Sequence, residues 1–155
     1  PALGLYASHA YLTRFGRPES LAPKDWHAPG NPHTLLGLDR DDLYLRIMRG
    51  IGFAEWTRED FKVRCDSQAF SIQATLAGVG IGAIQRSLAA RLPDLVPVLP
   101  EVRLPDLPVW LVAHQDVRRS ARVRTVFDFL AQELTAFFGV EDNATKTSGE
   151  KLETQ

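Results

Sequence analysis

Cysteine is almost absent from the sequence, since Cys65 is the only one in 155 residues. A single cysteine cannot form a disulfide within the chain, and it cannot supply the several thiolates of a cysteine-based zinc site. The class of small secreted proteins held together by disulfides is therefore excluded, and a reducing compartment suits the chain.

Long apolar runs and an excess of positive charge are also missing. No segment has the roughly 18 consecutive apolar residues that a membrane-spanning helix needs, and no signal peptide opens the chain. The 18 Lys and Arg are balanced by 19 Asp and Glu, which gives a formal net charge of −1. A stand-alone nucleic-acid binder usually carries a basic excess, because it neutralises phosphates. We therefore expect a cytoplasmic protein whose own surface contacts neither a membrane nor DNA.

The composition that is present suits a globular domain. Hydrophobic residues make up 45% of the chain and charged residues 24%, which is enough apolar material for a core. Strand-like and helix-like segments alternate nearly throughout, and this order predicts an α/β fold with a largely parallel or mixed sheet. The expected strands cover about 3–7, 33–38, 61–65, 81–84, 95–99 and 109–113, and the expected helices about 9–15, 41–49, 69–77, 87–91 and 120–138.

Several short motifs, taken in order, resemble the effector-binding domains of LysR-type transcription regulators. The run Gly4–Leu12 with Gly16 is similar to the start of the second lobe of those domains. Three further stretches resemble later parts of the same domain in the same order: Leu35–Asp39, Val63–Gln68 with Ala77–Gly82, and Leu107–Leu134. No single motif is specific, whereas the ordered set over residues 3–138 is.

This resemblance implies a two-lobed α/β fold like that of periplasmic binding proteins. It assigns residues 1–92 to a complete second lobe and 93–139 to the C-terminal part of the first lobe. Residues 140–155 are polar and lack core-forming side chains, so we expect a disordered tail there. It also implies that a small-molecule effector, such as a carboxylate or an aromatic acid, binds between the lobes. DNA would be contacted only through a helix-turn-helix domain that this chain lacks. Because an incomplete lobe exposes strand edges, we expect a homo-oligomer.

The first candidate ligand-binding residues are Asp66, Ser67 and Gln68, which precede an expected helix. Their plain role is to cap that helix, because an Asp or Ser side chain accepts a free backbone N–H of the first turn. A helix N-terminus also attracts anions and could therefore hold a carboxylate effector. An Asp cap would occupy the same donors, which leaves Ser67 and Gln68 as neutral hydrogen-bonding groups.

The family resemblance adds four more residues to the expected effector cleft. It places Ser8 and His9 near the hinge, and Leu38 and Asp39 at the end of the second strand. The alternative roles are structural: Ser8 would cap the helix that follows it, and the His9 ring would be exposed.

Other motifs do not point to a cofactor, a metal or catalysis. Gly78, Gly80 and Gly82 follow a helix and open a strand, which is the reverse of a dinucleotide-binding turn. The four histidines lie far apart at spacings that do not suit a metal site, and no serine sits in a nucleophile elbow. We therefore expect no enzyme activity, no metal and no cofactor. An arginine cluster before and within the last helix suits a solvated face or acidic groups of a neighbouring subunit: Arg118, Arg119, Arg122 and Arg124.

Three alternatives to the sensor remain open. A solute-binding protein of a transporter shares the two-lobed architecture, although it needs a signal peptide. A small enzyme could use a similar scaffold. A naturally truncated regulator could associate with full-length relatives and impair their binding to DNA.

Overall fold

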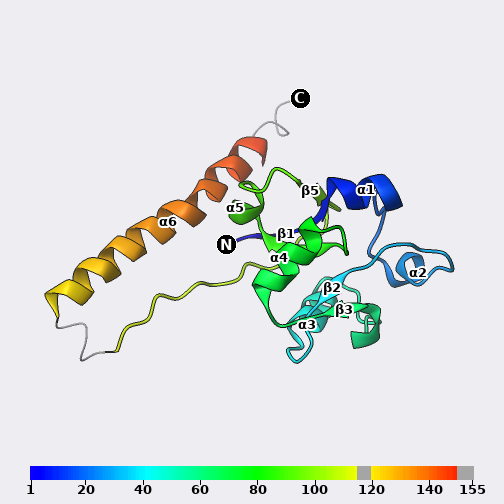
Figure 1. Cartoon of the computed structure of the whole chain (residues 1–155), viewed down its shortest axis with the longest axis horizontal. Helices are drawn as coiled ribbons and strands as arrows, with labels where there is room; N and C mark the ends of the chain where they lie inside the picture. The colour runs from blue at the N-terminus through cyan, green and yellow to red at the C-terminus, as the bar shows by residue number, and fades with distance from the viewer. Residues whose placement is uncertain (115–119, 150–155) are drawn as a thin grey trace. The chain divides into compact units, whose positions relative to one another are not determined.

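The computed structural model describes residues 1–114 and 120–149, which belong to two compact units (Figure 1). The larger unit is Ala2–Pro105, and the smaller one consists of Pro1 and the chain from Asp106 onward. All the strands that the structure describes lie in the larger unit.

The centre of the larger unit is β1 (Leu3–Ser8), which pairs antiparallel with two strands. It lies between β4 (Gly82–Gln85) and β5 (Leu95–Val98). Alternate β1 side chains point to opposite faces, as the period of a strand requires. Leu5 and Ala7 enter the larger core cluster, whereas Tyr6 packs against a second, smaller cluster.

A parallel pair extends the structure on the β4 side. This pair is β2 (Leu36–Gly37) and β3 (Val63–Arg64), and a parallel bridge joins Leu35 to Ile81 just before β4. The combination of parallel and antiparallel pairing confirms the mixed sheet that the sequence predicts.

Helices cover both faces of these strands. On one face, α4 (Gln68–Leu76) and α5 (Arg86–Ala89) contact β1 and β4. The other face carries the larger core cluster, to which Tyr11, Trp26 and Met48 belong. These three residues come from α1 (His9–Phe15), α2 (Pro23–Trp26) and α3 (Leu43–Gly50), respectively; a short 3-10 helix, η1 (Arg58–Asp60), follows.

Trp56 is the largest fully buried side chain of this cluster, with 2% of its surface exposed. Its ring centroid lies 5.3 Å from those of both Trp26 and Phe61. Its indole Nε1–H donates to the Leu21 carbonyl at 3.1 Å, so the polar edge of a buried aromatic is satisfied. Trp26, in α2, is buried as well.

The ends of α1 confirm the local prediction. Ser8 is the N-cap, and its Oγ accepts the Tyr11 N–H at 3.2 Å. Gly16 follows the helix with φ +77°, a conformation that glycine adopts without the steric cost of a side chain. At α3 the N-cap is Asp42, and the neighbouring Asp41 carboxylate accepts the Leu43 N–H at 2.8 Å.

The expected strand at 109–113 is absent from the structure. This segment pairs with no other described strand, and Trp110 and Val112 are 80% and 83% exposed. An apolar segment forms a strand only where a neighbouring strand supplies hydrogen-bond partners, so the apolar pattern at 109–113 was not sufficient to predict one.

The long helix of the smaller unit, α6 (Ala121–Gly149), runs beyond the predicted end near Phe138. Residues 140–149 are therefore helical rather than disordered, and 150–155 lie outside the described residues. Extending an existing helix adds one hydrogen bond per residue fixed, so polar residues can continue it without a new nucleation step.

The expected division into lobes at residue 92 stays a prediction, since the compact units are not themselves the two lobes. The larger unit continues to Pro105 because β5 pairs with β1. Of the described helices, none combines the length and apolar character needed to span a membrane.

Candidate functional site

The N-terminus of α4 carries two of the predicted ligand-binding residues on the surface. Ser67 is the N-cap, and its Oγ accepts the Phe70 N–H at 3.3 Å. The Gln68 side chain is exposed, and its Nε2 lies 3.5 Å from the Ala83 carbonyl, at the limit of a hydrogen bond. Both side chains therefore keep hydrogen-bonding capacity for a ligand.

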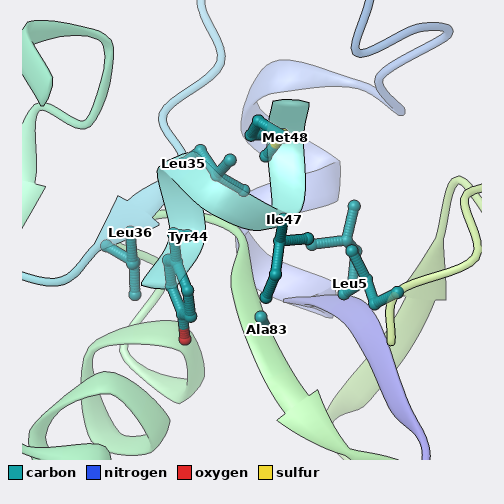
Figure 2. Close-up of a pocket in the computed structure, with 8 residues that line it drawn as sticks. Leu5, Leu35, Leu36, Tyr44, Ile47, Met48 and Ala83 are labelled. Carbon is teal, nitrogen blue, oxygen red and sulfur yellow. The ribbon is translucent and has the colours of Figure 1, made fainter. Parts of the chain in front are cut away.

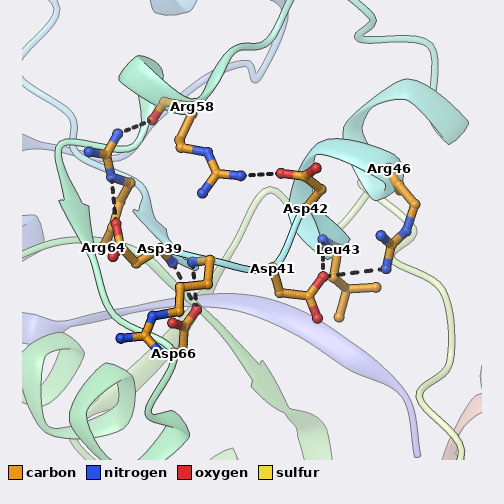
Figure 3. A network of polar contacts seen from close by, with 9 residues as sticks. Asp39, Asp41, Asp42, Leu43, Arg46, Arg58, Arg64 and Asp66 are labelled. Atoms are coloured by element: carbon orange, nitrogen blue, oxygen red, sulfur yellow. Dashed lines mark hydrogen bonds and ion pairs between the residues drawn. The ribbon is translucent and has the colours of Figure 1, made fainter.

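Asp66 does not cap α4 but joins two strand ends (Figure 3). Its Oδ1 accepts the backbone N–H of Asp39 at 2.9 Å and of Arg40 at 3.0 Å. These backbone hydrogen bonds hold the pKa of the Asp66 carboxyl below its usual value, and the bond from the Arg40 N–H has the largest effect. The expectation that Asp66 would accept the free N–H groups at the start of α4 is therefore wrong, because its Oδ1 accepts N–H groups of the loop after β2 instead.

The parallel pairing of β2 and β3 explains why these residues meet. Carboxyl ends of parallel strands lie at the same edge of a sheet, so the residues after Gly37 and after Arg64 become neighbours. Because α4 begins directly after β3, its N-terminus lies at this edge as well. We name the resulting group the strand-end site; its members are Leu38, Asp39, Asp66, Ser67 and Gln68.

Arginine side chains surround the strand-end site. Arg64 Nε lies 3.5 Å from Asp39 Oδ1, and Arg64 Nη1 donates to the Arg58 carbonyl at 3.0 Å. Arg58 in turn pairs with Asp42, which connects η1 to the start of α3 (Figure 3). Sequence reasoning missed Arg64 and Arg58, because only the folded chain brings them to Asp39 and Asp42.

The charges around the strand-end site cancel. Four carboxylates stand beside four guanidinium groups, so a bound molecule would meet directed hydrogen bonds rather than a strong net field. The carboxylates are those of Asp39, Asp41, Asp42 and Asp66, and the guanidiniums are those of Arg40, Arg46, Arg58 and Arg64.

Ser8 and His9 are not part of this group. Ser8 Oγ lies 3.4 Å from the point that a Cβ on Gly78 would occupy, so Ser8 lies beside the C-terminal end of α4. Ser67 marks the other end of this nine-residue helix, about 13 Å away at 1.5 Å per residue. The Ser8 side chain is also buried and accepts the Tyr11 N–H, whereas His9 is exposed.

A separate apolar pocket lies beneath α3 (Figure 2). The pocket has room for about one water molecule, and among its lining side chains only Tyr44 carries an oxygen or nitrogen atom. Burial raises the pKa of the Tyr44 phenol, so this hydroxyl stays protonated. Such a lining does not suit a charged metabolite. The lining residues are Leu5, Leu35, Leu36, Tyr44, Ile47, Met48, Ala83 and Leu104.

The described part of the chain contains no group of three or more His, Cys, Asp or Glu side chains placed to hold a metal ion. The strand-end site therefore offers amide, hydroxyl, carboxylate and guanidinium groups, which is a chemistry of hydrogen bonding.

Comparison with known proteins gives a consistent result. Residues 3–135 match the family model described as "LysR substrate binding domain". Among solved structures, the regulatory domain of CrgA, a LysR-type transcriptional regulator from Neisseria meningitidis, is similar with a TM-score of 0.64 and 22% identity. The match covers 86% of this chain and 64% of that chain.

A second structure of CrgA has a TM-score of 0.65 at 22% identity and covers 86% of this chain and 45% of that one. The chain thus spans less than two thirds of either relative. At this identity the likeness shows the fold, and it confirms the α/β fold class that the sequence predicts. A search of curated proteins gave no match.

Proposed function

Because the chain belongs to the family of LysR substrate-binding domains, we propose that it is the effector-sensing part of a bacterial LysR-type transcription regulator. The domain binds a small metabolite in the cytoplasm without transforming it. Bound metabolite changes the balance between conformations of the regulator, and it can do so only through a difference in affinity for them. DNA is contacted by a part of the regulator outside this chain.

The observation that carries the proposal is the strand-end site. Two parallel strand ends and a helix N-terminus meet there. Because Asp66 Oδ1 accepts the N–H groups of Asp39 and Arg40, this oxygen does not occupy the N–H donors at the start of α4. A helix N-terminus favours an anionic group through its free N–H donors and its partial positive charge. This supports a carboxylate metabolite as the effector.

Each residue of the strand-end site has a distinct role in this proposal. The Gln68 amide and the Ser67 hydroxyl hydrogen-bond the ligand carboxylate, and Leu38 supplies an apolar contact. Asp66 holds the loop that carries Asp39, and Arg64 fixes the Asp39 carboxylate. Ser8 and His9 remain a separate prediction, because the length of α4 lies between them and this site.

Matched pairs of variants test the site by isothermal titration with a carboxylate metabolite that stabilises the wild-type chain. We expect Gln68→Ala to weaken binding at least tenfold, as the loss of about 1.4 kcal/mol implies. Gln73→Ala, an exposed glutamine later on the same helix, should leave affinity unchanged.

Ser67→Ala and Ser8→Ala form the second pair. Each removes the N-cap of one helix and should cost about 1 kcal/mol of stability. We expect Ser67→Ala to weaken binding at the strand-end site, whereas weaker binding in Ser8→Ala would support the separate prediction for Ser8. Equal affinity in the Gln68 and Ser67 variants and the wild type would refute the proposed site.

A further inference from the structure

We draw no further inference here: the strongest candidate, the surface groove that Arg46 and Arg103 line between the end of α3 and the segment 103–105, carries no proposal, because nothing in the described residues shows what covers it.

Discussion

Replacing Gly37 by alanine is expected to destabilise the larger unit. A Cβ on Gly37 would lie 2.5 Å from both Cβ and Cγ of Phe61, closer than non-bonded carbon atoms can approach. The Phe61 Cβ is fixed by its own backbone, so no change of rotamer relieves this contact. Phe61 is also buried against Trp56, which leaves the ring no free direction.

The magnitude follows from the kind of strain. Forcing an extra methyl group into a packed core costs about 1–3 kcal/mol. For a cooperative unit of about 100 residues, each kcal/mol lowers Tm by about 4–8 °C, so Gly37→Ala should lower Tm by about 4–24 °C. The strain falls on the parallel pair β2–β3, where the Cys65 N–H donates to the Gly37 carbonyl at 3.0 Å.

Gly50→Ala is the matched control for this prediction. Gly50 ends α3, and a Cβ there meets no atom within 4 Å. Alanine at such a helical position reduces the entropy of the unfolded chain, and it should stabilise by up to about 1 kcal/mol. Thermal melts followed by circular dichroism compare the two variants. A Gly37→Ala variant with the Tm of the wild type would refute the packing of β2 against Phe61.

Three further predictions concern single side chains. Trp56→Phe should lower the free energy of unfolding, measured in urea, by about 2–4 kcal/mol, because it leaves the Leu21 carbonyl without its donor and shrinks a buried ring. The pKa of Asp66 is lower in the folded chain than its usual value of 3.8, so the stabilising contribution of the ionised carboxylate is present above pH 3.8 and is lost as the pH falls through the folded pKa. Urea midpoints measured against pH should therefore fall less steeply in acid for Asp66→Asn than for the wild type. Burial lowers the pKa of His33, so protonation favours the unfolded chain; stability should decline as the pH falls below 6.5, and a His33→Gln variant with an unchanged decline would refute this.

Features that depend on neighbours in sequence were predictable. The ends of α1 follow from Ser8 and Gly16, whose preferences for a helix N-cap and for the turn after a helix are local. Ser67 caps α4 for the same reason.

Features that depend on distant partners were not predictable. Asp66 reads as a helix cap in the sequence, yet its partners lie 26 and 27 residues away, after β2. The apolar alternation at 109–113 carries no information about whether another strand is present to pair with it. Arg58 and Arg64 enter the surroundings of the site only through the parallel pairing of β2 and β3.

The most direct test of the proposed function is a thermal-shift screen of the wild-type chain and Gln68→Ala against carboxylate metabolites. A ligand that binds only the folded chain stabilises it by about 2.7 kcal/mol at a hundredfold excess over Kd. The proposal predicts a saturable rise in Tm with one chemical class of carboxylate, and a smaller rise in Gln68→Ala. No rise with any carboxylate, or equal rises in both chains, would contradict an effector site at the start of α4.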